Sequence, residues 1–237
     1  MPYPIPSNVI PFLVLGIVAT SLGVRGLYFY NKRKSPISLY YSLGILLIGI
    51  STLFYSVPFI FTRDEQILKI VTNCGDFFYY ASILVMARLI WYLGFAKKIS
   101  FVWVLLPYLL IIIACQMIVI NSWSEITYQF YSDYVYFPVD KIASWLFAAM
   151  STAYIFVGFI TIRQARTIKD LRQKIRLNSI GIAFLLGGLI AIYNYLFLQG
   201  TNTGSIGAIG YIGIAIVLFI GIFIISRKSS NSKAITK

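Results

Sequence analysis

The sequence contains no histidine. It therefore lacks the side chain that most often serves as a general base, a zinc ligand or a proton relay near neutral pH. Its two cysteines, Cys74 and Cys115, are too few for a disulfide-rich secreted domain. Because both fall in apolar segments, we expect two buried, unpaired thiols, although a disulfide between neighbouring helices is geometrically conceivable.

Charged residues are also scarce, at 11% of the 237 residues, whereas hydrophobic residues make up 59%. That balance excludes a soluble domain of this length and predicts a membrane protein. Acidic residues number seven against twenty lysines and arginines, which gives a net charge of +13. A basic chain can bind nucleic acid, but here the basic residues lie beside apolar segments. We therefore expect contact with an anionic inner leaflet and no nucleic-acid partner.

Seven segments are long and apolar enough to cross a bilayer, which takes about 20 residues in a helix. Backbone polar groups in lipid must be satisfied within their own segment, so these segments are expected to be helices. The fold class predicted is an all-α membrane protein, a seven-transmembrane helix bundle in one domain over residues 9–226. The expected spans are residues 9–30, 38–61, 67–96, 101–120, 142–162, 177–198 and 205–226.

Lysine and arginine are concentrated in alternate loops, and such loops face the cytoplasm. The loops after spans one, three and five, with the segment after span seven, hold Lys32, Arg33, Lys34, Lys97, Lys98, Arg163, Arg166, Lys169, Arg172, Lys174, Arg176, Arg227, Lys228, Lys233 and Lys237. The opposite side has only three basic residues near its loops and also holds five acids; these residues are Arg63, Lys69 and Lys141, and Asp64, Glu65, Glu125, Asp133 and Asp140. We therefore predict a multi-pass plasma-membrane protein with residues 1–8 outside and residues 227–237 as a basic cytoplasmic tail.

The stretch VTNCGDFFYY, residues 71–80, places an acid inside the third span. Asp76 lies about 13 Å beyond Ile67 along the helix, at 1.5 Å per residue. A charge at that depth costs at least a few kcal/mol unless it is paired, hydrated or neutralised by a proton. Its neighbours on the same helical face form one polar stripe, which consists of Lys69, Thr72, Asn73, Tyr79 and Tyr80.

Polar side chains in the outer halves of other spans can meet this stripe. They are Ser51, Thr52, Tyr55 and Ser56 on span two, Asp140, Lys141, Ser144 and Trp145 on span five, and Tyr193, Asn194, Tyr195 and Gln199 on span six. If they converge, they form an outward-facing pocket with a polar base and aromatic walls. Two simpler explanations stay open. The tyrosines can form an interfacial aromatic belt, and Asp76 can make an internal hydrogen bond that holds two helices together.

Several kinds of chemistry lack the residues that they need. A retinal protein would need a lysine in span seven, and no lysine occurs there before Lys228. A metal site needs a cluster of ligands, a hydrolase needs a base beside its nucleophile, and an intramembrane aspartyl enzyme normally needs two acids. We therefore expect no cofactor, no metal and no enzymatic activity.

Three stretches carry a resemblance to a known family. They are NKRKSPISLYYSLGILLIGISTLFYSV, residues 31–57; RLIWYLGFAKKISFVWVLLPYLLIII, residues 88–113; and RQARTIKDLRQKIRLNSIGIAFLLGG, residues 163–188. With its span number, orientation and loop lengths, the chain resembles the N-terminal seven-helix sensor region of certain bacterial histidine kinases over residues 9–227. Residues 227–237 hold no phosphoacceptor histidine and no ATP-binding lobe. The resemblance therefore implies a sensor module whose output passes through a partner.

We expect a receptor-like sensory module that binds a small ligand or a proton from the outer side and signals through cytoplasmic loops. The expected ligand-binding residues are Lys69, Thr72, Asn73, Asp76, Tyr79, Tyr80, Tyr193 and Asn194. The expected contact surface for a cytoplasmic partner or lipid is Arg163, Arg166, Lys169, Arg172, Lys174 and Arg176. The alternative is a small transporter or channel that uses Asp76 in its pathway, although the apolar sequence SILVMA in the inner half of span three argues against it. A lipid-modifying enzyme is a third possibility, without visible catalytic residues.

Overall fold

The structure is a computed structural model that describes residues 5–95, 98–123, 127–130, 135–136, 139–197 and 204–219. The helices are α1 (Val9–Arg33), α2 (Pro36–Phe54), α3 (Pro58–Phe61), α4 (Glu65–Ile90), α5 (Phe101–Asn121), α6 (Lys141–Ala165), α7 (Leu171–Phe197) and α8 (Gly204–Phe219). A π-helical turn, Trp91–Phe95, continues α4. The short strands β1 (Gln129–Phe130) and β2 (Val135–Tyr136) pair antiparallel between α5 and α6.

Within the described residues, six helices are long and apolar enough to cross a membrane. They begin at Val9, Pro36, Glu65, Phe101, Lys141 and Gln173. The chain is therefore a helical multi-pass membrane protein. Of the seventh expected span, residues 205–226, the structure describes α8 as far as Phe219; residues 220–226 and the expected tail, residues 227–237, lie outside the described part of the chain.

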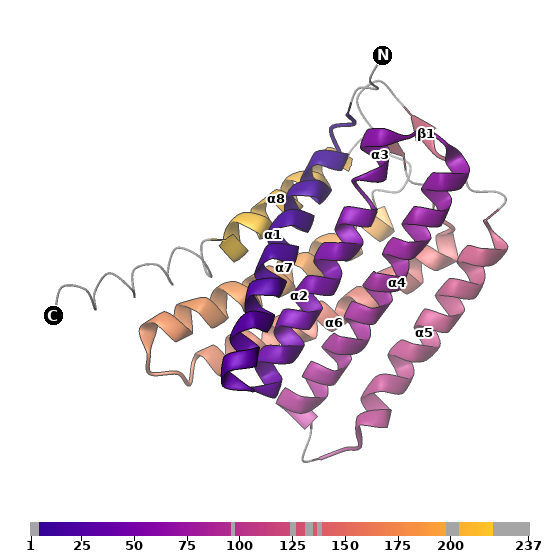
Figure 1. The fold of residues 1–237 in the computed structure, drawn as a ribbon. Coiled ribbons are helices and arrows are strands. Elements are labelled where there is room, and N and C mark those ends of the chain that lie inside the picture. Colours follow the sequence, from indigo (N-terminus) through magenta and orange to yellow (C-terminus); the bar gives the residue numbers. More distant parts are fainter. Residues whose placement is uncertain are drawn as a thin grey trace, which may run out of the picture.

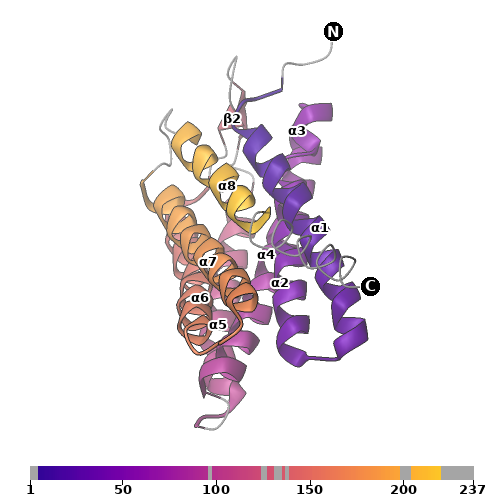
Figure 2. The same ribbon diagram turned by 90° about the vertical axis from the view of Figure 1, so that its left-hand side faces the viewer.

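The helices form a closed ring with one helix outside it (Figures 1 and 2). Going round, α1 packs on α2, α2 on α4, α4 on α6, α6 on α7, α7 on α8, and α8 again on α1. Helix α5 packs against α4 and α6 from outside. Its most apolar stretch is 11% buried, against 50% for α6, so α5 is the peripheral helix of the bundle.

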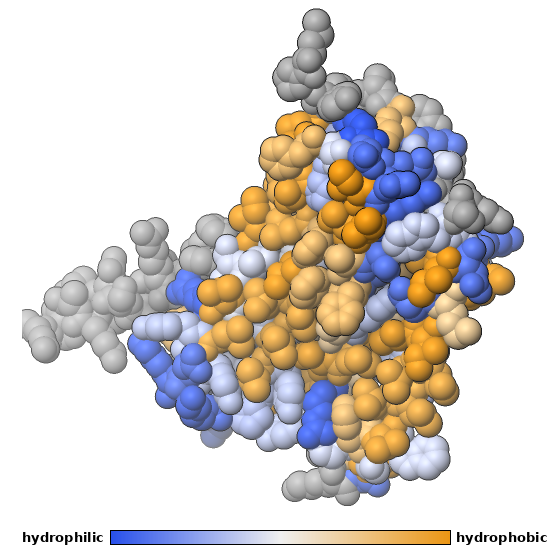
Figure 3. All heavy atoms as spheres, turned by 45° about the vertical axis from the view of Figure 1, so that its right-hand side comes forward, coloured by the Kyte–Doolittle hydropathy of each residue, from blue (hydrophilic) through white to orange (hydrophobic). Residues whose placement is uncertain are grey.

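Large apolar side chains cover the outside of the bundle. In Figure 3, hydrophobic residues spread across the middle of the face shown, and hydrophilic residues gather toward its two ends. Exposed examples include Ile17 on α1, Phe77 on α4 and Phe159 on α6. A contiguous apolar surface of this kind is stable in lipid, where an exposed leucine or phenylalanine has no cost of hydration.

Two acids fix the beginnings of α4 and α6. The carboxylate of Asp64 accepts hydrogen bonds from the backbone N–H groups of Gln66 and Ile67 at 2.9 and 3.1 Å. The carboxylate of Asp140 accepts from Ile142 and Ala143 at 2.7 and 3.1 Å. Aspartate at this position satisfies N–H groups that have no partner within the helix. Both acids thus have a local structural role at the same end of the bundle.

Pro58 divides the second expected span, residues 38–61, into two helices. Proline has no N–H, and its ring clashes with the carbonyl four residues earlier, which here belongs to Phe54. Helix α2 accordingly ends at Phe54, and Pro58 opens the one-turn helix α3. The expected span 38–61 lies within the single membrane-crossing segment Pro36–Phe61, but its helix is interrupted before Pro58. The break leaves Tyr55 at the end of α2, where its side chain turns toward α4.

The connection between α6 and α7 is shorter than the expected loop, residues 163–176. Helix α6 continues to Ala165 and α7 begins at Leu171. Arg163 therefore lies in the last turn of α6, and residues 172–176 lie in the first turns of α7. The connecting residues Arg166 and Lys169 are exposed. The expected basic loop is in fact a short turn between two basic helix ends.

The two cysteines differ in environment, contrary to the expectation that both are buried. Cys74 is exposed on the outer face of α4, whereas Cys115 on α5 is buried, and both are free thiols. The Cys115 sulfur accepts a hydrogen bond from the Tyr80 hydroxyl at 3.6 Å. The disulfide that the sequence left open is not formed.

Glycines bring α6 and α7 into close contact. A Cβ atom on Gly158 would lie 2.6 Å from the Gly181 carbonyl oxygen and 2.6 Å from the Leu185 nitrogen. A Cβ atom on Gly188 would lie 3.0 Å from the Ser151 carbonyl oxygen. Small residues at such positions allow two helix backbones to approach each other in a membrane.

We expect Gly158→Ala to lower the free energy of unfolding by about 1–3 kcal/mol, because the new methyl group meets backbone atoms that cannot move aside. The matched control is Gly213→Ala on α8, where a Cβ atom would meet nothing within 4 Å. Alanine favours a helix over glycine, so the control should be neutral or slightly stabilising. Unfolding by sodium dodecyl sulfate, followed by circular dichroism, measures both. Equal midpoints for the two variants would contradict the close packing.

Candidate functional site

A cavity of about 340 Å³ lies inside the ring of helices. Its walls come from α1, α2, α4, α5, α6, α7 and α8, together with residues before α1 and near β2. The polar and aromatic residues among them are Asn8, Phe12, Ser51, Thr52, Tyr55, Lys69, Thr72, Asn73, Asp76, Tyr79, Trp123, Tyr128, Asp140, Phe147, Tyr154, Phe184, Asn194, Tyr195 and Tyr211. A cavity of this size and lining is typical of a small-molecule site.

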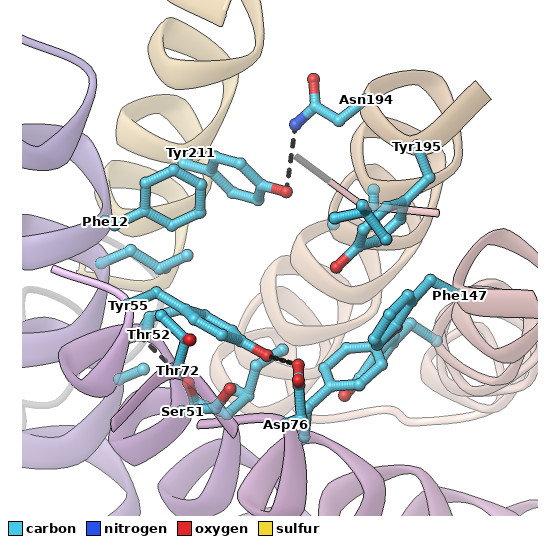
Figure 4. A pocket seen from close by; sticks show the side chains of 18 of the residues that line it. Phe12, Ser51, Thr52, Tyr55, Thr72, Asp76, Phe147, Asn194, Tyr195 and Tyr211 are labelled. Carbon is cyan, nitrogen blue, oxygen red and sulfur yellow. Dashed lines mark hydrogen bonds between the residues drawn. The ribbon is translucent and has the colours of Figure 1, made fainter. Parts of the chain in front are cut away.

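The carboxyl group of Asp76 and the hydroxyl of Tyr55 form the polar centre of the cavity. Tyr55 donates a hydrogen bond to Asp76 Oδ1 across the α2–α4 contact. In Figure 4 the Asp76 side chain points into the cavity, with Tyr55 on one side and Phe147 on the other. The break at Pro58 places Tyr55 there, and the helical position of Asp76 turns its carboxyl inward.

The polar stripe on α4 is held by partners from three different segments. Asn73 Oδ1 accepts a hydrogen bond from Gln116 Nε2 on α5 at 3.1 Å. The hydroxyl groups of Thr72 and Tyr128 share a hydrogen bond at 2.6 Å. Lys69 Nζ lies 3.2 Å from a carboxylate oxygen of Glu65, one turn earlier. Lys69 is therefore paired with Glu65.

Tyr128 lies in the connection between α5 and α6, at the mouth of the cavity. Burial raises the pKa of Tyr128 to about 12, and the hydrogen bond with Thr72 partly offsets that rise. The Tyr128 hydroxyl therefore stays protonated at physiological pH. It serves as a neutral hydrogen-bonding group beside the polar stripe.

Aromatic rings form a continuous wall opposite Tyr55. Phe147 stacks on Tyr195 with ring centroids 5.0 Å apart and on Tyr80 at 6.0 Å. Tyr79 lies 5.8 Å from Phe147 and 6.2 Å from Tyr154. Ring pairs at these separations attract one another beyond the burial of their surface. The wall is thus a preformed surface of π-faces that crosses from α7 through α6 to α4.

Aromatic side chains also close the deep end of the cavity. Tyr154 and Phe184, which line the cavity, stack with centroids 6.1 Å apart and an interplanar angle of 4°. Tyr41 packs against Phe184 at 6.1 Å and shares a hydrogen bond with Thr161. The hydroxyl groups of Ser82 and Tyr154 are also hydrogen-bonded. These residues form the floor of the cavity, and the floor connects α2, α4, α6 and α7.

The mouth of the cavity lies at the end where α1 and α4 begin. Asn8 lines the mouth, and its side chain makes two hydrogen bonds to the backbone of the neighbouring strand β2. Asn8 Nδ2 donates to the Val135 carbonyl at 2.7 Å, and Asn8 Oδ1 accepts from the Val135 N–H at 3.1 Å. Val135 is buried against Val9 and Phe59. The pair β1–β2 is thereby held beside the entrance.

Two buried acceptors in the cavity wall find no hydrogen-bond partner among the described residues. They are Ser51 Oγ on α2 and Asn194 Oδ1 on α7. Asn194 uses its Nδ2 group to donate to the Tyr211 hydroxyl at 3.2 Å. A buried polar atom without a partner costs free energy, which makes such atoms candidate contacts for a ligand.

The cavity includes most of the residues expected at the site. Lys69, Thr72, Asn73, Asp76, Tyr79 and Asn194 line it. Tyr80 is buried behind the wall and bonds to Cys115. Tyr193 is 45% exposed and packs against Phe197 on the outside of α7, so its neighbour Tyr195 takes the place expected for it.

Several cavity residues were absent from the expected set. Tyr55 was named as a possible partner, but it was not assigned to the site. Four further lining residues were not distinguished from other aromatic residues: Phe12, Phe147, Phe184 and Tyr211. The rule that Pro58 ends a helix at Phe54 could have indicated Tyr55. No sequence pattern separates the four others from the many aromatic residues that face lipid.

The basic residues lie at the end opposite the cavity mouth. Arg163, Arg166, Lys169 and Arg176 are exposed there, and Lys174 is half-buried. The backbone of Arg172 lies in the first turn of α7. Arg88 stands nearby, stacked over Trp91 and Phe101 at 4.5 and 4.4 Å. Lys97 lies outside the described residues.

Comparison of the chain with protein-family models, curated proteins and solved structures finds no match. The geometry and chemistry of the cavity therefore carry the functional argument.

Proposed function

We propose that this chain is a receptor-like sensory module of the plasma membrane, with seven spans, its N-terminus outside and its C-terminus in the cytoplasm. It binds a small ligand that enters from the outer side, and it signals to a cytoplasmic partner. The resemblance to sensor regions of bacterial histidine kinases agrees with this role. The observation that carries the proposal is the cavity, whose described lining extends from Asn8 and Asp140 at one end to Tyr154 and Phe184 inside the ring.

The distribution of charge supports entry from outside. Asp140 and Lys69 line the cavity at its mouth, and Asp64, Glu65, Arg63 and Lys141 lie at the same end of the bundle. This end has fewer lysines and arginines than the other. Described basic residues such as Lys32, Lys98 and Arg166 lie at the other end. By the positive-inside rule, that other end faces the cytoplasm. The cavity then opens to the exterior.

The closed floor favours a receptor over a transporter. Below Tyr154 and Phe184 the ring is filled by apolar residues, including Ile83, Met86 and Val157, which are fully buried. A permeation path would need polar or hydrated surface through this inner half. The described inner half instead has scattered polar groups, such as the pair Tyr41 and Thr161 and the amide of Asn178, and none of these three residues lines the cavity. The cavity is a binding site that ends midway.

The same floor offers a route for the signal. Tyr41 and Thr161 join α2 to α6 one turn before α6 ends at Ala165. A ligand that displaces Phe184 or Tyr154 would move this contact and therefore the turn between α6 and α7. A ligand shifts such an equilibrium only when it binds the two arrangements with different affinities.

The basic end of α7 is suited to contact with an anionic surface. Leu171 and Ile175 are 66% and 39% exposed, and Lys174 and Arg176 lie between and beyond them. Apolar side chains that alternate with basic ones can insert at a bilayer interface. We propose that Arg163, Arg166, Lys169, Arg172, Lys174 and Arg176 contact anionic lipid or the cytoplasmic partner.

Flux measurements separate a receptor from a transporter. We expect liposomes that contain the wild-type protein to pass protons and potassium no faster than empty liposomes, because the floor is closed. Asp76→Asn, which keeps the side-chain size, should behave in the same way. Robust flux in the wild type that is lost in Asp76→Asn would overturn the proposal in favour of a transporter.

A second readout tests transmission. Ala191→Cys, placed in the wall of the cavity in a Cys74→Ala/Cys115→Ser background, is labelled with benzyl methanethiosulfonate to fill the cavity. Trp91, at the opposite end, is kept as the sole tryptophan by replacing Trp103, Trp123 and Trp145 with phenylalanine. Labelling should change the emission of Trp91. No change after complete labelling would contradict a receptor role.

A further inference from the structure

The cavity has an excess of acidic groups although the chain is strongly basic. Asp76 and Asp140 line it, and its lysine, Lys69, is paired with Glu65 at 3.2 Å. The net charge of these four groups is negative, whereas the whole chain has a net charge of +13. A cavity with walls of low dielectric concentrates the field of such groups and attracts ions of opposite sign.

The unpaired polar atoms in the wall are acceptors. Ser51 Oγ and Asn194 Oδ1 are buried without a hydrogen-bond partner among the described residues. The Asp76 carboxyl receives one hydrogen bond, from Tyr55, and an ionised carboxylate can accept several. A ligand that donates hydrogen bonds fits an ionised Asp76 carboxylate, which can only accept, and also Ser51 Oγ, which can accept or donate.

The aromatic wall suits a positive charge as well as an apolar body. Phe147 and Tyr195 are stacked at 5.0 Å, and Figure 4 shows both beside Asp76 in the cavity. The face of an aromatic ring attracts a cation, and the attraction grows when water is excluded. A carboxylate flanked by π-faces is the chemistry that recognises an ammonium group.

We propose, on the basis of the function proposed above, that the ligand is a small organic cation: a protonated amine with an apolar body. Its ammonium group bonds to Asp76, and Ser51 Oγ in the same cavity wall is a further hydrogen-bonding partner. Its apolar part lies against Phe147 and Tyr195 and reaches toward the floor. The acids in the cavity lining, Asp76 and Asp140, attract the cation into the cavity.

Charge-selective labelling in intact cells tests this assignment. The target thiol is Ala191→Cys in the Cys74→Ala/Cys115→Ser background, and the reference is Thr127→Cys, exposed at the same end of the bundle. Each is treated from outside with a cationic reagent, 2-(trimethylammonium)ethyl methanethiosulfonate, and with the anionic 2-sulfonatoethyl analogue. We expect the cation-to-anion rate ratio at Ala191→Cys to exceed that at Thr127→Cys by about tenfold or more. Asp76→Asn should remove most of that excess.

The outcomes separate the two proposals. Equal ratios at the two positions, or a selectivity that Asp76→Asn leaves unchanged, would overturn the cationic ligand and leave the outward cavity standing. If neither reagent labels Ala191→Cys while Thr127→Cys reacts, the cavity does not open outward and the proposed function itself fails. Thr167→Cys, exposed in the turn between α6 and α7, should stay unlabelled and reports sidedness. Size-exclusion profiles that match the wild type establish that each variant is folded.

Discussion

Replacing Phe147 by alanine is expected to lower the free energy of unfolding by about 3–5 kcal/mol. Phe147 is 3% exposed and stacks on Tyr195 at 5.0 Å and on Tyr80 at 6.0 Å. Its removal would break the aromatic wall at its centre and join the cavity to new empty space. Neighbouring rings on two other helices, α4 and α7, would lose contacts that lipid cannot replace. Titration with sodium dodecyl sulfate, followed by circular dichroism, measures the loss.

The matched control is Phe156→Ala on the same helix. Phe156 is 55% exposed on the outer face of α6. Lipid tails are about as apolar as the lost ring, so they take its place in both the folded and the unfolded state. The control should shift the unfolding midpoint far less than Phe147→Ala. Similar shifts for the two variants would show that the wall does not organise the bundle.

The double variant Tyr55→Phe/Asp76→Leu is expected to keep the free energy of unfolding unchanged or to raise it by about 1–4 kcal/mol. It replaces both partners of the Tyr55–Asp76 hydrogen bond with apolar side chains. Neither the donor nor the acceptor of that bond is then left buried without its partner. The same variant should lose the charge selectivity of labelling at Ala191→Cys. If the double variant keeps its stability but loses charge selectivity, Asp76 serves ligand binding and not stability.

This experiment also decides between the two explanations of Asp76 that the sequence leaves open. If the acid only holds α2 against α4, the double variant should be less stable than the wild type. A hydrogen bond between transmembrane helices contributes on average about 0.6 kcal/mol. A loss of more than about 1 kcal/mol, measured in the same detergent titration, would therefore assign Asp76 a structural role. The single variant Tyr55→Phe, which keeps the acid, is the control.

The positions of the membrane helices could be predicted from the sequence because they depend on local properties. Length and apolarity decide that a segment enters lipid, and a helix then satisfies its own backbone. The ends of the helices also follow local chemistry. Asp64 and Asp140 begin α4 and α6, and Pro58 interrupts the helix of the second span.

The inner stripe of α4 was predictable for a related reason. An acid inside a span must avoid lipid, and helical spacing then turns Thr72 and Asn73 to the same side. The same reasoning fails for aromatic residues, since a tyrosine is stable in a cavity wall, in a core and at an interface. Tyr193 was therefore preferred to Tyr195, although Tyr195 lines the cavity and Tyr193 is 45% exposed, and the predicted site residue Tyr80 does not line the cavity.

The stretch of residues 71–80 thus indicated by itself an acid that must face the interior, because a charge at that depth is costly when lipid surrounds it. Which groups meet that acid was decided by the packing of the helices. The order of helices around the ring, the outer position of α5 and the pairing of Tyr55 with Asp76 depend on contacts between distant segments. Apolar helices of similar length are interchangeable in sequence pattern, and only their fit against one another selects the neighbours that enclose the cavity.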